Sequence, residues 1–305
     1  MRTIRGLESY PPDAGPTAVA LGVFDGIHLG HRAILGRAVE LARARGLEGV
    51  ACTFDPHPME VLQPGRAPLP LTTLADRLAL IGGTGITTTV VIAFTREVSG
   101  MEPEAFVESV LLGVLRAREV VVGFNHRFGR AARGDARLLE ALGPRLGLGV
   151  HVVPPTTVDG VGVSSSEIRA ALAQGDLQRA ARLLGRDYTV GGEVVHGAGR
   201  GQSLGFPTAN IRAELPLPLP AGVYVGRADI GSAAYTAVVN IGVRPTFGDS
   251  TSAVEAHLLD FSGDLYGRRM RLTFLRRLRE ERRFPSVEAL RAQIAVDVAS
   301  AREPA

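Results

Sequence analysis

Over roughly the first 184 residues, short apolar runs alternate with amphipathic stretches, and this alternation constrains the fold more than any other feature. The run at 17–24 is typical of a buried strand, and the stretch at 30–45 of a helix. The pattern continues through strand-like ranges at 50–54, 87–94, 119–123 and 149–153 and helical ranges at 73–81, 103–115, 136–142 and 165–173. Because buried parallel strands need helices on both faces, we predict an α/β domain over residues 1–184.

The pattern of apolar and turn-forming residues changes after about residue 185. Short β-rich segments follow at 188–195, 222–229, 234–241, 253–260 and 270–278, separated by Gly- and Pro-rich connections. One amphipathic helix is expected at 286–300. This half, residues 185–305, is therefore predicted to be a small antiparallel barrel or sandwich with a C-terminal helix.

The chain contains no lysine, and this absence excludes several chemistries. All 34 basic residues are Arg, so neither a Walker A lysine nor a lysine Schiff base is available. A net charge of +3 does not favour nucleic acid as a partner, and the single cysteine, Cys52, allows no disulfide framework and no cysteine-based zinc site. Since no apolar run approaches the length of a membrane span, about 18 residues, we expect a soluble, cytoplasmic protein without membrane contact.

The segment GVFDGIHLGH, residues 22–31, lies where the first predicted strand ends and the first helix begins. In an open α/β sheet this junction binds ligands, and a helix N-terminus offers free amides to an anion. Gly22 and Gly30 let the backbone approach a phosphate, and Phe24 lies in the same loop. His28 and His31 project toward one side and can donate hydrogen bonds to α-phosphate oxygens. The loop is thus a candidate site of nucleotidyl transfer.

A second candidate anion site begins a later predicted helix, in the segment VSSSEIR at 163–169. Ser164, Ser165 and Ser166 stand with Arg169 on the first turns, which suits a pyrophosphate leaving group. A serine N-cap without any ligand is the alternative interpretation.

A glycine-rich segment, residues 192–211, opens the second half with five glycines. The loop through Gly197, Gly201 and Gly205 can cradle a polyphosphate with its amides. Thr208 and Asn210 follow and offer neutral oxygen ligands on one side of an extended strand, as Mg²⁺ bridging ATP phosphates prefers.

Transfer of a phosphoryl group to an alcohol needs a carboxylate to accept the proton. Glu255, in the segment VEAHLLDF at 254–261, is a candidate, on a predicted strand where Glu255, His257 and Leu259 share one face. Asp260 is a rival by the same logic, and spacing does not separate the two.

The first-half motifs together resemble the HxGH nucleotidylyltransferase superfamily. The segments FDPHP (54–58), LTTLADRLALI (71–81) and VVGFNHRFG (121–129) narrow the resemblance to the adenylyltransferase module of the bacterial bifunctional riboflavin kinase/FAD synthetases. This resemblance implies a Rossmann-like domain of the HxGH type.

The same resemblance implies roles for individual residues. His28 and His31 would contact ATP phosphates, the three serines and Arg169 would bind the triphosphate, and Asn125 would help to place the reacting groups. Phe54 and His57 would lie near the flavin. His126 departs from the family pattern, in which Phe is frequent at this position.

The second half resembles riboflavin kinases. Its ordered signatures are LGFPTANI (204–211), GVY (222–224), NIGVRPTFG (240–248), EAHLLDF (255–261), DLYG (264–267) and LREERRF (278–284). The resemblance implies a barrel kinase in which Thr208 and Asn210 hold Mg²⁺-ATP and Glu255, rather than Asp260, is the base. By the same resemblance, Arg279 and Phe284 would lie at the edge of the flavin site.

The combined interpretation is a bifunctional enzyme. It would phosphorylate riboflavin to FMN with ATP and Mg²⁺, then adenylylate FMN to FAD with release of pyrophosphate. Two alternatives stay open: a riboflavin kinase with a degenerate first domain, and a non-enzymatic flavin- or nucleotide-binding regulator. The expected partners are riboflavin, FMN and ATP, and homo-oligomerisation is left open.

Overall fold

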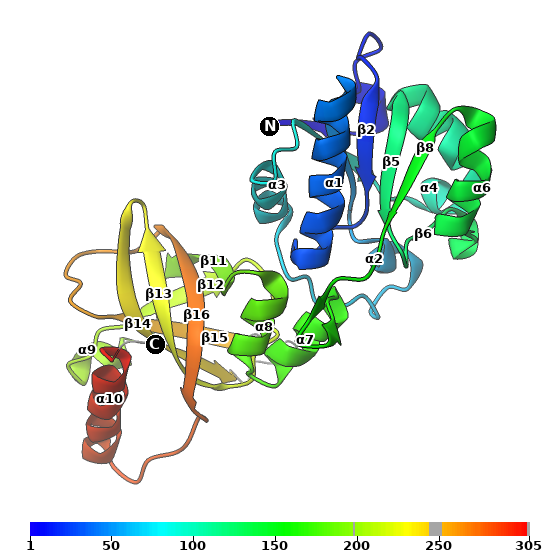
Figure 1. The fold of residues 1–305 in the computed structure, drawn as a ribbon. Coiled ribbons are helices and arrows are strands. Elements are labelled where there is room, and N and C mark those ends of the chain that lie inside the picture. Colours follow the sequence, from blue (N-terminus) through cyan, green and yellow to red (C-terminus); the bar gives the residue numbers. More distant parts are fainter. Residues whose placement is uncertain (198, 244–251, 304–305) are drawn as a thin grey trace. The chain divides into compact units, whose positions relative to one another are not determined.

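The computed structural model describes residues 1–197, 199–243 and 252–303, which form two compact units, Met1–Ser165 and Ser166–Ala305 (Figure 1). Residues 244–248 of the predicted NIGVRPTFG signature lie outside the described residues.

The first unit is built on a six-stranded sheet whose strands all run parallel, in the order β1-β4-β3-β2-β5-β8. The strands are β1 (Arg2–Arg5), β2 (Thr17–Leu21), β3 (Glu48–Asp55), β4 (Thr88–Ala93), β5 (Ala117–Gly123) and β8 (Gly149–Val153). The helices are α1 (Leu29–Arg45), α2 (Pro58–Leu62), α3 (Leu74–Gly82), α4 (Arg96–Gly100), α5 (Pro103–Ala105), a π-helix (Phe106–Val114) and α6 (Ala136–Leu146). Two short ribbons pair β6 (Arg127–Phe128) with β7 (Gly134–Asp135) and β9 (Thr157–Val158) with β10 (Val161–Gly162).

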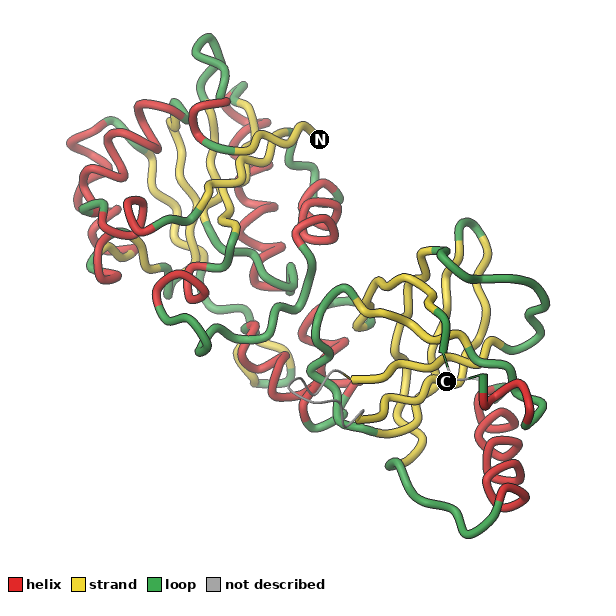
Figure 2. The backbone as a smooth tube through the Cα atoms, turned by 180° about the vertical axis from the view of Figure 1, so that it is seen from behind, coloured by secondary structure: helices red, strands yellow, loops and turns green. Residues whose placement is uncertain are grey.

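Side-chain alternation along the strands separates two apolar layers. Ala18 and Ala20 of β2 pack with Ala38 and other residues of α1, whereas Val19 and Leu21 belong to a cluster with the π-helix. Helices accordingly lie on both sides of the sheet (Figure 2). This arrangement confirms the predicted Rossmann-like α/β domain.

Strand β2 is shorter than predicted. It ends at Leu21 because Phe24, Gly26 and Ile27 adopt positive φ angles of 56°, 83° and 40°, which turn the chain sharply before α1. Periodicity marks Phe24 as apolar and buried but does not reveal this turn.

The second unit is a closed six-stranded antiparallel barrel in the order β11-β12-β15-β14-β13-β16. The strands are β11 (Tyr188–Val195), β12 (Ala209–Ala213), β13 (Gly222–Ile230), β14 (Ala233–Val243), β15 (Ser252–Leu258) and β16 (Arg269–Arg279). The helices are α7 (Ser165–Ala173), α8 (Leu177–Leu184), α9 (Arg200–Ser203) and α10 (Val287–Ala301). The barrel with its C-terminal helix was predicted; strand β12 was anticipated only as the extended segment carrying Asn210.

The two units divide at Ser165, whereas the sequence places the domain boundary between residues 184 and 185. The reason is that α8 packs on β11 and β16 of the barrel, and the turn before it lies against Arg277. Helical pattern alone does not reveal which core a connecting helix joins.

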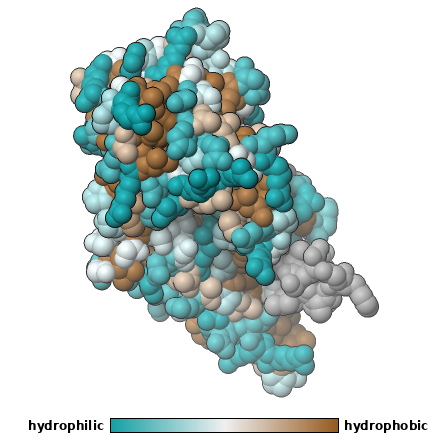
Figure 3. Space-filling view, turned by 90° about the vertical axis from the view of Figure 1, so that its right-hand side faces the viewer, coloured by the Kyte–Doolittle hydropathy of each residue, from teal (hydrophilic) through white to brown (hydrophobic). Residues whose placement is uncertain are grey.

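The barrel has a filled interior and a partly covered exterior. Tyr224 and Phe274 are fully buried inside, with ring centroids 5.6 Å apart in an edge-to-face contact. On the outer face Val223, Val225 and Val238 pack with Ala301 of α10. Elsewhere on the surface, in the view of Figure 3, hydrophobic residues lie in groups between hydrophilic side chains.

Candidate active sites

The strand order brings three predicted motifs to one edge of the parallel sheet. β2 lies between β3 and β5, so the segments that follow these strands meet at their carboxyl ends. These segments carry Phe54 and His57 after β3, His28 after β2, and Asn125 after β5. The edge is where open parallel sheets bind ligands.

His28 and His31 form a stacked pair at the start of α1. Their ring centroids are 3.6 Å apart with an interplanar angle of 17°, and Phe24 meets His31 edge-to-face at 5.4 Å. His28 caps the helix, because its Nδ1 accepts the backbone N–H of His31 at 3.2 Å. In the neutral ring this contact assigns the proton to Nε2, which is then the group that can donate to a ligand.

His31 is held in the neutral form. Burial lowers its pKa well below 6.5, and the neighbouring charges of His28 and Arg77 lower it further. Its Nδ1 is buried and has no partner among the described residues. Neutral stacked rings avoid the repulsion that two imidazolium groups would have at this distance.

The glycines of this loop make room for specific side chains. A Cβ on Gly22 would stand 3.0 Å from the ring of Phe24, and one on Gly30 would stand 3.2 Å from Cε1 of His28. A side chain at either position would therefore crowd the neighbouring ring, and glycine avoids this.

Asp25 anchors the loop, a role that the sequence analysis did not identify. Its buried carboxylate accepts the backbone N–H groups of Leu71 and Thr72 at 3.0 and 3.2 Å. Its backbone carbonyl accepts a hydrogen bond from the hydroxyl of Ser165 at 3.0 Å. This serine of the second motif therefore contacts the GVFDGIHLGH loop. Both partners lie in motifs that the sequence analysis identified, FDG and LTT. Local periodicity, however, does not show that segments 46 residues apart are in contact.

The later residues of the second motif belong to the other compact unit, whereas Ser164, like Ser165, belongs to the first. Ser166 and Arg169 lie on α7 beyond the division at Ser165, and their part in the nucleotide site stays a prediction. Glu167 next to them pairs with Arg179 of α8 at 2.7 Å, so its negative charge is balanced.

Phe54 and His57, which are predicted to lie near the flavin, each contact residues of the surrounding fold. Phe54 is buried and meets Phe94 edge-to-face at 5.6 Å. His57 caps α2, accepting the N–H of Met59 on Nδ1 at 3.1 Å. Asn125 is exposed, and its chain neighbours Phe124 and His126 line a cavity of about 360 Å³.

In the barrel, strand register aligns the predicted kinase residues on one row. Glu255 of β15 pairs with Asn210 of β12 on one side and with Asn240 of β14 on the other. Asn240 pairs with Val223 of β13, which pairs with Arg279 of β16. Paired residues project to the same face, and Val223 packs on the outer face below α10, so the row lies on the outside of the barrel.

The predicted metal ligands lie against the glycine-rich segment. A Cβ on Gly197 would stand 2.0 Å from Nδ2 of Asn210, and one on Gly201 would stand 2.9 Å from Oγ1 of Thr208. These two glycines therefore let the backbone close over the two neutral oxygen ligands. Gly205 adopts a φ of 85°, which favours glycine in the turn that follows.

The two candidate bases differ in their surroundings. Asp260 follows β15 in a turn with a φ of 58° and forms an exposed bidentate pair with Arg302 at 2.7 and 3.0 Å, and this pair lowers its pKa. Glu255 lies on the strand beside Asn210. Glu255 and His257 lie on the predicted face of β15. Leu259 lies one residue beyond the strand and is buried in the outer-face cluster that contains Val223 and Val238.

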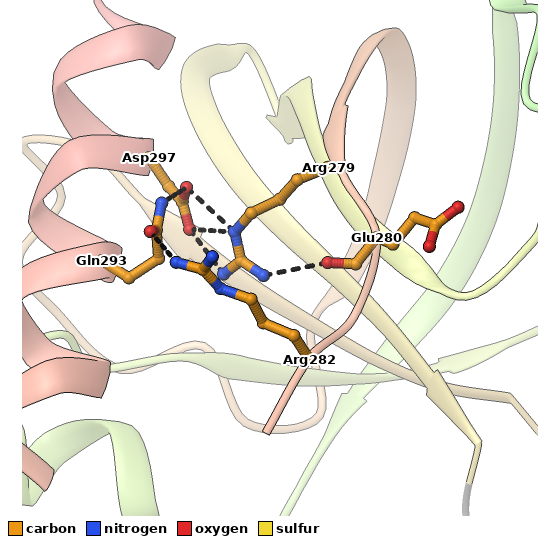
Figure 4. A network of polar contacts seen from close by, with 5 residues as sticks. All are labelled: Arg279, Glu280, Arg282, Gln293 and Asp297. Atoms are coloured by element: carbon orange, nitrogen blue, oxygen red, sulfur yellow. Dashed lines mark hydrogen bonds and ion pairs between the residues drawn. The ribbon is translucent and has the colours of Figure 1, made fainter. Parts of the chain in front are cut away.

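Arg279 belongs to a network that joins β16 to α10 (Figure 4). Its Nε and Nη2 donate to the carboxylate of Asp297 at 3.1 and 2.8 Å, and Gln293 donates to the same carboxylate at 2.9 Å. Arg282 in turn donates to Gln293. The guanidinium carbons of Arg279 and Arg282 stand 5.6 and 4.9 Å from the ring centroid of Phe284.

The first domain has a histidine pair at a helix N-terminus of a parallel sheet, and the barrel has a glycine-covered pair of predicted metal ligands beside a carboxylate. Together these features are typical of a two-domain nucleotide-dependent transferase. Family models agree with this class: one described as FAD synthetase matches residues 11–167 and one described as riboflavin kinase matches residues 184–304. The chain belongs to the family of bifunctional riboflavin kinase/FMN adenylyltransferases.

Individual relatives cover nearly the whole chain. The bifunctional riboflavin kinase/FMN adenylyltransferase of Pseudomonas fluorescens is 40% identical over 99% of this chain and 97% of its own length. The protein of the same name from Escherichia coli strain K12 is 36% identical over the same shares. A crystal structure titled macrolide-efflux protein from Streptococcus pneumoniae superposes with a TM-score of 0.91 and 28% identity, covering all of both chains. None of the helices in the described ranges combines the length and apolar character that a membrane span requires.

Proposed function

We propose that this protein makes FMN from riboflavin and ATP in its barrel, and FAD from FMN and a second ATP in its α/β domain. The observation that carries the proposal is that each of the two matched family models contains one of the candidate sites. One is the stacked histidine pair at α1, and the other is the row containing Asn210 and Glu255.

In the kinase step, Glu255 accepts the proton of the ribityl 5′-hydroxyl as its oxygen attacks the γ-phosphorus of ATP, and ADP leaves. Thr208 and Asn210 fit Mg²⁺ through neutral oxygens, and the loop over them has the close backbone that a polyphosphate cradle needs. When bound, Mg²⁺ supplies charge neutralisation on the phosphates. Arg279 and Phe284 lie next to each other and contact the edge of the flavin.

In the adenylyl step, an oxygen of the FMN phosphate attacks the α-phosphorus of ATP, and pyrophosphate leaves. His28 donates from Nε2 and the neutral His31 ring supports it, so negative charge on the phosphorus oxygens meets prearranged hydrogen-bond donors. Gly22, Phe24 and Gly30 shape this loop, while Ser164 and Ser165 bind the leaving pyrophosphate. Asn125, Phe54 and His57 place FMN.

Substitution of Glu255 by Gln tests the kinase assignment. We expect riboflavin phosphorylation to fall by about 100-fold or more, because a general base is lost while shape is kept. FAD formation from supplied FMN and ATP should persist. The measurement is chromatographic separation of FMN and FAD with each substrate in turn.

Glu193→Gln serves as the matched control, since Glu193 is an exposed strand carboxylate of the same barrel. Full kinase activity in Glu255→Gln would remove Glu255 from the mechanism. Absence of FAD formation by the unmodified chain would instead favour the kinase-only alternative.

A further inference from the structure

His257 is a polar residue of the barrel that the proposed kinase step does not use. It lies on β15 two residues after Glu255, on the same face of the strand, and pairs in register with Val238 of β14. Its Nδ1 lies 2.8 Å from the carbonyl oxygen of Pro207. Because a carbonyl oxygen can only accept, the ring donates from Nδ1, and the contact decides which nitrogen of the neutral ring carries the proton.

This hydrogen bond lies where the pairing of β12 with β15 ends. The last pair in this direction joins Ala209 to Ala256, so Thr208 is the first residue beyond the ladder. Pro207 precedes it and has no N–H group with which to extend the ladder. The imidazole of His257 takes the place of a further ladder hydrogen bond, and it holds the peptide group that joins Pro207 to Thr208.

Phe206 connects the same turn to the glycine-rich segment. Its ring meets that of His257 edge-to-face, with centroids 5.6 Å apart at an angle of 87°. Its backbone N–H donates to the carbonyl of Gly201 at 2.9 Å, and Gly201 lies directly against Oγ1 of Thr208. The turn that presents Thr208 is thus held by the glycine-rich segment and by a side chain from the strand that carries Glu255.

We propose that His257 is a positioning residue for phosphoryl transfer, which donates from Nδ1 to the carbonyl of Pro207 and so holds the hydroxyl of Thr208 where Mg-ATP binds. His257 acts through Thr208 and takes no part in the chemistry itself. Loss of the hydrogen bond frees the peptide before Thr208, and a ligand that is displaced binds the nucleotide less well. The inference rests on the proposed kinase reaction of the barrel.

The test compares three substitutions of His257 in the full-length chain. His257→Phe keeps a ring beside Phe206 and removes the donor. His257→Asn places an amide N–H at the position of Nδ1, whereas His257→Gln places it near that of Nε2, away from Pro207. Tyr224→Phe is the matched control, because it also removes a side-chain hydrogen bond to a proline carbonyl of the barrel, that of Pro220 at 2.6 Å. Riboflavin phosphorylation is measured against Mg-ATP and against riboflavin, and circular dichroism follows folding.

A second measurement uses the unmodified protein without any ligand. The ¹⁵N NMR signals of the His257 ring, identified by their loss in His257→Phe, report its tautomer at about pH 8, where a free imidazole is neutral. We expect the proton on Nδ1. A neutral ring that carries its proton on Nε2 overturns the proposal.

His257→Phe should raise the KM for Mg-ATP by about tenfold and leave the KM for riboflavin unchanged, since only the nucleotide meets Thr208. His257→Asn should return the KM for Mg-ATP to within about twofold of the unmodified value, and His257→Gln should resemble His257→Phe. Tyr224→Phe should keep both KM values. An unchanged KM for Mg-ATP in folded His257→Phe overturns the proposal. If His257→Phe does not fold, the other two variants decide, and equal KM values in His257→Asn and His257→Gln overturn it.

These outcomes are distinct from a failure of the proposed function. If the unmodified chain forms no FMN from riboflavin and Mg-ATP, the kinase assignment fails and the inference falls with it. If that reaction proceeds normally but His257→Phe follows the Tyr224→Phe control, only the role of His257 is lost.

Discussion

At the scale of single residues, two glycines of helix α1 have very different surroundings. A Cβ on Gly30 would crowd the ring of His28 at 3.2 and 3.3 Å, whereas one on Gly36 would meet nothing within 4 Å. The first glycine therefore protects the position of a predicted catalytic ring, and the second lies in an ordinary helix interior.

Gly30→Ala should displace the ring of His28 and lower FAD formation from FMN by about tenfold or more, since hydrogen-bond donors act only when correctly placed. Gly36→Ala should leave that rate unchanged and stabilise the domain by up to about 1 kcal/mol, because alanine favours a helix. Initial rates and thermal unfolding followed by circular dichroism measure both. Equal rates in the two variants would contradict the placement of His28.

We expect His126 to make the stability of the α/β domain depend on pH. Its ring stacks on Phe128 with centroids 5.7 Å apart, and burial lowers its pKa from 6.5 to about 4. Between these two values the unfolded chain binds more protons, so stability falls as the pH drops from 6.5 toward 4, and His31 acts in the same direction.

His126→Phe, which introduces the residue frequent in the family, should remove this share of the pH dependence. Between pH 6.5 and 4, the free energy of unfolding of the unmodified chain should fall by at most about 3 kcal/mol more than that of the variant, because each unit of pKa shift corresponds to about 1.36 kcal/mol. Urea unfolding at several pH values between 7.5 and 4.5 measures it. The same slope in both proteins would show that His126 is not buried in the folded state.

At the scale of elements, α10 is attached to the barrel by the largely buried ion pair of Asp297 with Arg279, by a hydrogen bond from Arg276 to the carbonyl of Ser300, and by the apolar packing of Ala301. The side chains of Asp297 and Arg279 are 5% and 19% exposed, while those of the pair between Asp260 and Arg302 are 71% and 55% exposed. Helix α10 is less amphipathic than predicted, because Val287 and Val296 are exposed and its buried residues are Asp297 and Ala301.

Asp297→Asn should destabilise the barrel by about 3 kcal/mol, because it leaves the guanidinium of Arg279 partly buried without its counter-charge. It should also raise the KM for riboflavin, since Arg279 is proposed to edge the flavin. Asp260→Asn, at the exposed pair, should change stability little. Denaturant unfolding and kinase kinetics test this, and equal effects of the two substitutions would contradict it.

At the scale of the whole molecule, the two proposed sites are carried by different units. The histidine pair belongs to the first unit and the Glu255 row to the second. The product of one reaction is the substrate of the other, so a chain deficient in one step should be complemented by a chain deficient in the other.

Mixing Glu255→Gln protein with a His28→Ala/His31→Ala protein should restore FAD formation from riboflavin and ATP, although neither variant makes FAD from riboflavin alone. The reason is that FMN released by the second protein diffuses to the first. Chromatography of the mixture against each variant alone measures this. If the mixture stays inactive while each remaining half-reaction proceeds, the two steps must share one chain.

The sequence by itself determined the alternation of strands and helices, the barrel that follows, and the residue types at both phosphate sites. It did so because periodicity, turn residues and short motifs act within a few residues of one another. Its short motifs also predicted His28, Asn210 and Glu255 as candidate site residues.

Only the tertiary structure decided the strand order β3-β2-β5, the row from Arg279 to Asn210, the buried anchor Asp25, and the hydrogen bond from His257 to Pro207. It also assigned α7 and α8 to the second unit. These features depend on register and packing between segments far apart in the chain, and a local pattern carries no information about which distant partner a buried charge or a strand will meet.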